Sequence, residues 1–372
     1  MTERRWFDWA GYAAPEIIDD AELEYFAIRS TSSLFDISPM VKYRISGPDA
    51  EQFLNHLTLR DVSKLNPGRV QYTAWCDDDG QVLDDGTLFR FDDTTFRLCC
   101  QERHLPWLLD TAVGYNVEVR EETDDIAALA LQGPTSAALL RDASIDVSGL
   151  KPFQIAALPK SFGKGHISRT GFTGDLGYEL FVDRQSAGAL WDHLWLYGPL
   201  RGLRAIGYHA LNVARIEAGF IVANADFVTS DGALRSNRPR LPDEIGLDWM
   251  VDLAKSHFNG KRAIERSRQT KARREMLVGL DIEGNEPAQH AIVYHAKRRE
   301  AGVVTAGVWS PTAKRNIALA AIDMRYAASD SLWVEIYALR ELRYHKLMKR
   351  ARIVERPFIK LPRRMRTPPG DY

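Results

Sequence analysis

Two adjacent carboxylates, Asp84 and Asp85, stand inside a segment that otherwise reads as a β-strand. Residues 81–91, QVLDDGTLFRF, place apolar side chains on both sides of the pair, between the turn sequences DDDG and DDTT. Asp and Gly are uncommon in strands, so Gly86 beside the pair indicates a bulge or a close backbone approach of a ligand. Neighbouring strand side chains point to opposite faces, so one carboxylate can face a cavity while the other faces solvent or caps a turn. The alternative is a frayed, exposed hairpin strand.

A third carboxylate, Glu179, lies near the end of the glycine-rich segment 169–180, RTGFTGDLGYEL. It stands in a predicted strand, where a buried carboxylate needs a partner. A planar edge with two donors, such as that of an aminopyrimidine ring, would satisfy both of its oxygens. An ordinary long hairpin turn also fits the glycines. The segment contains neither GxGxxG nor GxxxxGK[ST], which disfavours a nucleotide phosphate loop.

Other reactive side chains carry weaker signals. Arg215 and Glu217 lie on an otherwise apolar predicted helix, NVARIEAGF, where a surface ion pair is the plainest interpretation. Trp249, in IGLDWMVDL, is typical of a core residue. Neither the nine histidines nor the three cysteines have metal-ligand spacing, so no metal site is expected. The absence of a GxSxG motif leaves a hydrolase without its nucleophile.

The bulk properties exclude several classes of protein. The 372 residues have a net charge of −1, which points to no nucleic-acid or membrane partner. The basic stretch 340–366 could touch RNA or a lipid surface, but a solvated face explains it better. The first residues lack the apolar core of a signal peptide, and no run reaches the length of a membrane span. Together with the sparse cysteines, this favours a cytoplasmic protein.

The elements that must position these residues alternate irregularly between strand and helix, which predicts an α+β fold. Strands are expected at 43–46, 70–76 and 127–131, and a helix at 50–57. The pattern strand–Gly-Pro–helix occurs twice, at 43–57 and 128–142, which suggests two related sub-domains. Short strands and turns follow to the C-terminal region. We therefore predict an α+β region of two interleaved sub-domains at 1–275, a β-barrel domain at 276–362 and a tail at 363–372.

Taken in order, several stretches resemble the glycine cleavage T-protein family of aminomethyltransferases and its folate-dependent demethylase relatives. The stretches run collinearly from about residue 30 to 325 and read LFDIS, ISGPDAEQFLNHLTLRDVSKLNPGRVQYT, DDDGQVLDDGTLFR, LALQGP, RTGFTGDLGYELFV, RIEAGF, IGLDWMV, FNGKRAI and VTAGVWSPTAKRNIALAAID. The resemblance implies a three-domain cloverleaf around a central cavity that tetrahydrofolate enters pterin first, with a small C-terminal β-barrel.

The resemblance also implies site residues. Asp84, the first carboxylate of the pair, would be catalytic, orienting the pterin and balancing the proton and charge at its reactive nitrogens. Glu179 would bind the pterin edge, and Arg215 would hold Glu179 or the ligand. The other folate-binding positions implied are Tyr72, Gln101, Phe172 and Trp249. Of the tail arginines, Arg363 or Arg364 would meet the glutamate carboxylates of folate.

Departures from the family pattern concern the pocket. Phe172 stands where the family has tyrosine, Gln101 replaces an asparagine, and Gly86 replaces an aliphatic residue after the pair. These differences leave the one-carbon donor open. The donor is either an aminomethyl group on a lipoyl carrier protein or a small S-, O- or N-methyl compound. A folate-binding regulatory or assembly protein without turnover is the third reading.

Overall fold

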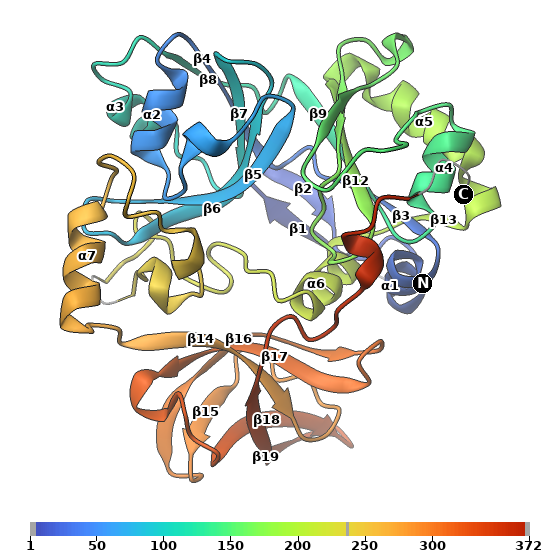
Figure 1. Ribbon diagram of the computed structural model, residues 1–372. Coiled ribbons are helices and arrows are strands. Elements are labelled where there is room, and N and C mark those ends of the chain that lie inside the picture. Colours follow the sequence, from blue (N-terminus) through green and yellow to red (C-terminus); the bar gives the residue numbers. More distant parts are fainter. Residues whose placement is uncertain (1–4, 236–237, 369–372) are drawn as a thin grey trace.

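The computed structural model, which describes residues 5–235 and 238–368, has three lobes arranged around its centre (Figure 1). Two lobes are sheets covered by helices, and the third is a closed barrel. This arrangement confirms the α+β fold and the three-domain cloverleaf that the sequence predicts. Within the described residues, no helix combines the length and the hydropathy needed to cross a membrane.

The first lobe contains an antiparallel five-stranded sheet in the order β5–β6–β7–β4–β8. Its strands are β4 (Val41–Ser46), β5 (Arg69–Cys76), β6 (Val82–Arg90), β7 (Thr95–Cys100) and β8 (Glu118–Glu121). Helices α2 (Ala50–Leu57) and α3 (Leu105–Thr111) cover its outer face. The apolar positions of α2 recur at helical spacing, so Phe53, Leu54 and Leu57 are all fully buried against that face.

The second lobe contains a six-stranded sheet in the order β10–β11–β12–β9–β3–β13. Its strands are β3 (Ser32–Asp36), β9 (Ile126–Gln132), β10 (Ile155–Ala157), β11 (His166–Ser168), β12 (Gly177–Asp183) and β13 (Leu203–Ala205), and its outer helices are α4 (Ser136–Asp142) and α5 (Ala187–Tyr197). The inner faces of the two sheets meet in one apolar cluster that includes Val70, Phe89, Cys99, Phe35, Ala128, Ala130 and Phe181. Side chains on the inner faces of β6 and β12 therefore face each other across this layer.

Both predicted strand–Gly-Pro–helix units are present, as β4–α2 and β9–α4. Gly47 and Gly133 begin the two turns with φ of 144° and 121°, in the region where glycine is strongly favoured. A Cβ at Gly47 would collide with the carbonyl oxygen of Asn116, and one at Gly133 with that of Thr31. The two units thus make the same tight backbone approach in the two lobes.

The third lobe is a closed six-stranded barrel, which confirms the small all-β module expected at the C-terminal end. Its order is β14–β17–β16–β15–β18–β19, with strands β14 (Glu275–Ile282), β15 (Ile292–His295), β16 (Arg299–Ser310), β17 (Arg315–Asp323), β18 (Leu332–Arg340) and β19 (Arg343–Val354). Helix α7 (Lys261–Thr270) precedes the barrel, and the segment after β19 runs back toward the second lobe (Figure 1).

The centre of the molecule is held by a buried ion-pair network between α1 (Ala21–Ser30) and α6 (Tyr208–Glu217). Arg29 Nη2 lies 2.7 Å from Glu217 Oε2, and Arg29 Nη1 lies 3.3 Å from Asp175 of the glycine-rich loop. Tyr25 Oη donates to Glu217 Oε1 at 2.6 Å, and the N–H of Phe358, after the barrel, donates to the Glu217 carbonyl at 2.9 Å. Glu217 therefore links α1 to the C-terminal segment, and Arg29 extends the network to the glycine-rich loop.

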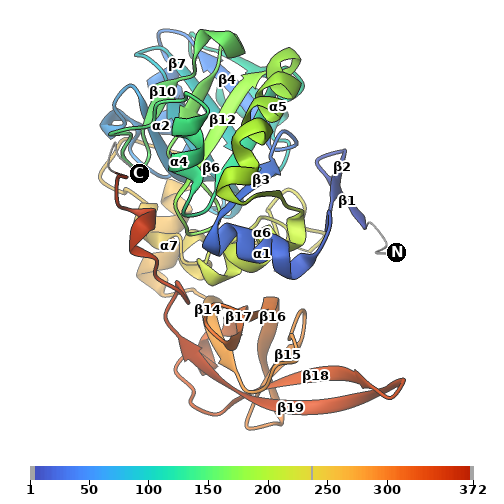
Figure 2. The same ribbon diagram turned by 90° about the vertical axis from the view of Figure 1, so that its right-hand side faces the viewer.

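A short N-terminal hairpin, β1 (Trp6–Trp9) and β2 (Tyr12–Pro15), lies on the opposite side of the centre from the C-terminal segment (Figures 1 and 2). The ring of Phe7 lies 4.6 Å from that of Tyr208, and the ring of Trp9 lies 5.9 Å from that of Phe35. These contacts attach the hairpin to α6 and β3. The back and front of the central region are thus covered by the two ends of the described chain.

The predicted strands and the predicted helix are all present. The strands expected at 43–46, 70–76 and 127–131 are β4, β5 and β9, which are longer than expected by one or two residues, and the helix at 50–57 is α2. Strand ends depend on the neighbouring strand with which they pair, so local sequence leaves them undefined.

Candidate folate site

Two connected cavities lie at the centre of the molecule. The wide cavity of about 1680 Å³ adjoins an inner cavity of about 250 Å³. Residues lining both are Tyr72, Phe153, Phe220, Ile221 and Arg364. The inner cavity is lined by residues of both sheets, by Arg364 and Met365 of the C-terminal segment, and by Trp9 of the N-terminal hairpin.

Asp85 projects from β6 into the inner cavity together with Gly86 and Thr87. Tyr72 Oη donates a hydrogen bond of 2.7 Å to Asp85 Oδ2 from the neighbouring strand β5. Burial and the nearby charge of Asp84 raise the pKa of the Asp85 carboxyl, and the bond from Tyr72 opposes that rise only in part. Asp85 can therefore hold a proton at a pH where an exposed aspartate is ionised.

The prediction that Asp84 faces the cavity is wrong. Its side chain is fully buried on the opposite face of β6, where Oδ1 accepts the N–H of Asp85 at 2.8 Å and Oδ2 accepts the N–H of Glu102 at 2.9 Å. A register shift opposite Trp75 and Cys76 inserts Leu83 as a bulge and sets which of the following residues face the second sheet. Alternation then turns Asp85, and not Asp84, into the cavity.

Gly86 is required by the sheet rather than by a ligand. It pairs with Cys100 of β7, and a Cβ at Gly86 would collide with the carbonyl oxygen of Cys99. Its lack of a side chain lets β7 approach closely beside Asp85.

Glu179 lies on the facing sheet and lines the same inner cavity. Its Oε2 accepts a hydrogen bond of 2.6 Å from Thr170 Oγ1, and no other hydrogen-bond partner of Glu179 is present in residues 5–235 and 238–368. Burial raises the pKa of the Glu179 carboxyl. A buried carboxylate with spare acceptor capacity is suited to a ligand that presents N–H groups.

Gln101 and Phe172 also line the inner cavity. The ring of Phe172 stacks on that of Phe220 with centroids 5.3 Å apart and planes 16° apart. This pair forms a flat apolar wall near the junction of the two cavities.

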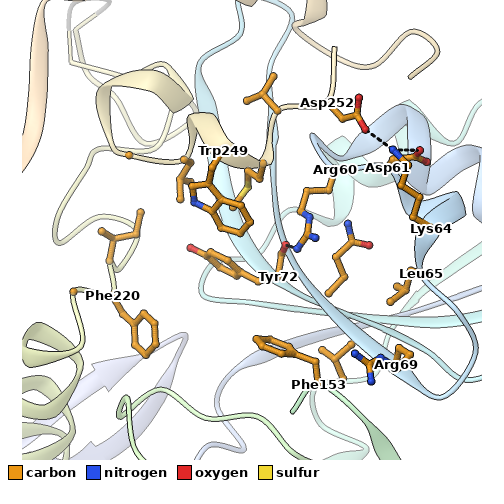
Figure 3. A pocket seen from close by; sticks show the side chains of 18 of the residues that line it. Arg60, Asp61, Lys64, Leu65, Arg69, Tyr72, Phe153, Phe220, Trp249 and Asp252 are labelled. Carbon is orange, nitrogen blue, oxygen red and sulfur yellow. Dashed lines mark hydrogen bonds and ion pairs between the residues drawn. The ribbon is translucent and has the colours of Figure 1, made fainter. Parts of the chain in front are cut away.

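Trp249 lines the wide cavity and does not reach the inner one. Figure 3 shows its indole beside the ring of Tyr72, with the Arg60 side chain next to both. The Tyr72 and Trp249 ring centroids are 6.3 Å apart, and the Arg60 guanidinium lies 5.3 Å from the indole centroid. Trp249 is 60% exposed, so the interpretation as a core residue is wrong, and its indole forms part of the wall of the wide cavity.

Arg215 does not hold Glu179, contrary to the expectation. It is buried beneath the segment that follows α6, where it pairs with Asp226, donates to the Phe220 carbonyl at 3.1 Å, and donates to Asn212 Oδ1 at 2.8 Å. It lines neither cavity. Its position near the end of α6 places the guanidinium under the segment that follows the helix. Arg215 therefore holds the backbone of Phe220 and does not contact Glu179.

The two tail arginines behave differently. Arg363 is paired with Asp175, at 2.6 and 2.9 Å, and donates to the Arg29 carbonyl at 2.8 Å, so its guanidinium is occupied within the protein. Arg364 lines both cavities and lies 4.9 Å from the centroid of Phe220. Burial lowers the pKa of Arg364. Arg364 is therefore the tail arginine available to a ligand.

Four arginines that line the wide cavity have no carboxylate ion-pair partner in the described chain: Arg60, Arg69, Arg356 and Arg364. Lys64 is different, because it is neutralised by Asp61 at 3.1 Å and Asp252 at 2.9 Å (Figure 3). The wide cavity is thus suited to an anionic group. Nowhere in residues 5–235 and 238–368 do three or more His, Cys, Asp or Glu side chains gather in a way that could hold a metal ion.

Several cavity residues carry no recognisable sequence signal. Trp9, Ile37, Met40, Tyr208 and Leu211 line the inner cavity near the hairpin. They are apolar or aromatic residues on ordinary strands, turns and a helix, and only the packing of hairpin, sheet and α6 brings them together. The carboxylate pair in the sequence indicated that one of the two residues faces a cavity. The sequence did not indicate the bulge that turns Asp85, rather than Asp84, into it.

Two sequence families match the chain. The family described as "GCVT N-terminal domain" matches residues 3–255, and that described as "Glycine cleavage T-protein C-terminal barrel domain" matches residues 276–360. Together they include both sheet lobes and the barrel.

Individual proteins are similar over most of this chain. An aminomethyltransferase of Bacillus subtilis is 32% identical over 360 residues, covering 95% of this chain and 94% of that protein. An aminomethyltransferase of Caldanaerobacter subterraneus is 33% identical over 326 residues, covering 86% of this chain and 84% of that protein. A trimethylamine-oxide aldolase of Ruegeria pomeroyi is 35% identical over 317 residues, which cover 82% of this chain but 39% of that longer protein.

A solved structure has the same fold. The glycine cleavage system aminomethyltransferase T from Bartonella henselae superposes with a TM-score of 0.84 at 25% identity, covering 96% of this chain and 94% of that chain. The arrangement of lobes is thus shared along almost the whole described chain.

Proposed function

The chain belongs to the glycine cleavage T-protein family of aminomethyltransferases, which are transferases of one-carbon groups, and from this premise we propose that it transfers a one-carbon unit from a donor to N5 of tetrahydrofolate. One observation carries the proposal: the inner cavity brings Asp85, with its bound Tyr72, and the under-satisfied Glu179 into one largely apolar space.

The residues present fit a reduced pterin. Glu179 can accept hydrogen bonds from the amino and ring N–H groups of the aminopyrimidine edge, which would satisfy its spare oxygen. Phe172 and Phe220 offer an apolar wall to a flat ring. Tetrahydrofolate would supply the nitrogen that accepts the one-carbon unit.

Asp85 is the group that holds or moves the proton. Its raised pKa lets one carboxyl oxygen carry a proton near neutral pH, while the other is fixed by Tyr72 Oη. The protein needs no covalent nucleophile of its own, because holding the donor carbon against the acceptor nitrogen can supply a large part of the acceleration. The low-dielectric cavity strengthens each of these contacts.

The glutamate portion of folate fits the wide cavity. Four arginines line it without a carboxylate partner in the described chain, so a carboxylate tail would find cations there. The aminobenzoyl linker would pass Tyr72 and Phe153, which line both cavities.

Two donors are compatible with the family, and one observation favours a small free methylated compound as the second candidate. One end of the inner cavity is walled by Trp9 of the N-terminal hairpin together with Met40 and Tyr208. Such an apolar end suits methyl groups. An aminomethyl group on a lipoyl carrier protein remains the first candidate through the aminomethyltransferase relatives.

Folate binding is the decisive test. Titration with 5-formyltetrahydrofolate, followed by tryptophan fluorescence, should show saturable binding. Glu179→Gln should weaken it by about tenfold or more, because one charge-assisted hydrogen bond is lost. The matched control is Asp93→Asn, since the Asp93 side chain is 90% exposed in the turn after β6. The proposal is wrong if the wild-type protein shows no folate affinity.

Product analysis then separates the donors. Ammonia release from an aminomethyl-lipoyl carrier identifies the aminomethyltransferase reaction. Methyl- or methylenetetrahydrofolate formed from a panel of small S-, O- and N-methyl compounds identifies a demethylase. Folate binding without turnover of either donor would leave the regulatory or assembly role.

A further inference from the structure

A buried histidine, His104, lies behind the reactive strand and outside both cavities. Its Nε2 is 3.3 Å from Asp84 Oδ2, and its Nδ1 is 3.2 Å from Asp231 Oδ2. Its side chain is 1% exposed, and that of Asp84 is not exposed at all, while that of Asp231 is 49% exposed. The three side chains form a line from the surface to the back of β6.

The geometry defines the charge of His104. Ionised carboxylates only accept hydrogen bonds, so a ring with a carboxylate at each nitrogen needs a proton on both. Burial alone would lower the pKa of His104, but the bonds to Asp231 and Asp84 outweigh it and raise the pKa to about 9. The backbone N–H of His104, at the start of α3, also donates to Tyr43 Oη at 2.7 Å, which ties His104 to β4.

Asp84 connects this imidazolium to the site. Its two oxygens accept the backbone N–H groups of Asp85 and Glu102, at 2.8 and 2.9 Å. Asp85 lines the inner cavity, and Gln101, beside Glu102, lines it as well. A single buried carboxylate thus joins the backbone of β6 to the end of β7 at the two points that carry cavity residues.

We propose that His104 is a positioning residue for the one-carbon transfer: as an imidazolium between Asp231 and Asp84, it compensates the charge of Asp84 and fixes the backbone that presents Asp85 and Gln101. The inference rests on the proposed function of the site. Asp84 acts through its charge and its backbone bonds, because it does not face the cavity.

The charged groups around Asp85 show why compensation matters. Asp84 and Asp226 raise the pKa of Asp85 after burial, and Tyr72 lowers it. Without the imidazolium, the negative charge of Asp84 would act on Asp85 at full strength. The carboxyl of Asp85 would then keep its proton to a higher pH, and a larger share of the protein would be protonated at neutral pH.

His104→Gln and Asp231→Asn test the proposal. Gln keeps a hydrogen-bond donor to Asp84 but removes the charge, and Asp231→Asn weakens the charge of His104 from a half-exposed loop position. We expect the midpoint of the pH dependence of folate binding and turnover to rise by about one unit in His104→Gln and by less in Asp231→Asn. If His104→Gln does not fold, the pH dependence measured for Asp231→Asn tests the proposal by itself.

Histidine NMR of the full-length protein supplies a readout that requires neither folate nor a donor. The His104 imidazole should remain charged beyond pH 8 in the wild type and titrate at lower pH in Asp231→Asn. A neutral His104 at pH 7, or variant pH profiles that coincide with the wild type, would overturn the inference. Absence of folate binding in the wild type would instead overturn the proposed function and leave the NMR result standing.

Discussion

Within the carboxylate pair, adjacent residues have opposite environments. Asp84 accepts two backbone N–H groups and faces His104, whereas Asp85 faces the inner cavity and accepts the Tyr72 hydroxyl. Strand alternation separates the two carboxylates, so each has its own set of hydrogen-bond partners. Asp84 thus raises the pKa of Asp85 from the face of β6 that points away from the inner cavity.

Asp85→Asn should abolish transfer while leaving folate binding nearly intact. Asn keeps the shape and the contact with Tyr72 but cannot accept or release a proton, so turnover should fall by about 10²- to 10⁴-fold. Single-turnover kinetics, with folate affinity measured in parallel, would show this. A variant that retains more than a tenth of the wild-type rate would remove Asp85 from proton transfer.

The same variant should be more stable than the wild type at alkaline pH. An acid whose folded pKa is raised binds protons more tightly when folded, so stability falls as pH rises from the unfolded toward the folded pKa. Asn removes that loss, so the ligand-free variant should be more stable by several kcal/mol, with a correspondingly higher Tm, at pH 9 and should gain nothing near pH 4. Thermal melts at both pH values check the sign. A gain that is equal at pH 4 and pH 9 would contradict the assignment.

Among the elements, the N-terminal hairpin contributes one of its tryptophans to the inner cavity. Trp9 is 8% exposed and forms part of the inner cavity, whereas Trp6 on the same hairpin is 58% exposed. The hairpin therefore presents one aromatic side to the cavity and the other to solvent.

Trp9→Ala should weaken binding of the one-carbon donor and leave folate binding nearly unchanged. Loss of the buried indole removes apolar contact at one end of the inner cavity, so KM for the donor that supports turnover should rise by about tenfold. Folate affinity should change by less than about threefold, because Glu179 lies elsewhere in the cavity. Trp6→Ala is the matched control and should leave both constants unchanged. An equal loss of donor and folate binding in Trp9→Ala would mean that the hairpin supports the whole cavity.

At the scale of the molecule, a buried polar network joins α1, α6, the glycine-rich loop and the C-terminal segment, in addition to the apolar clusters between the lobes. Glu217 accepts from Arg29 and Tyr25 and binds the C-terminal segment through its carbonyl, while Asp175 receives both Arg29 and Arg363. These buried charges are mutually satisfied, so removal of one leaves the others unpaired.

Glu217→Gln should therefore destabilise the protein by about 3 kcal/mol, because the buried guanidinium of Arg29 loses its closest anion. Denaturant unfolding would measure the loss. Asp323→Asn, which removes an ion pair with the exposed Arg325, is the control and should change the free energy of unfolding by less than about 0.5 kcal/mol. Equal effects of the two substitutions on the free energy of unfolding would show that the central network stabilises the protein no more than an exposed ion pair does.

The sequence by itself determined the α+β fold, the two strand–Gly-Pro–helix units, the C-terminal barrel and the motif positions around the cavity. These follow from local periodicity, turn residues and collinear motifs, which depend on neighbours along the chain. Only the tertiary structure decided that Asp85 replaces Asp84 in the cavity, that Arg215 supports a segment rather than Glu179, and that Trp9 lines the inner cavity. A one-residue bulge reverses the faces of a strand, and contacts between distant segments set each side chain's partner; neither is recorded in local sequence.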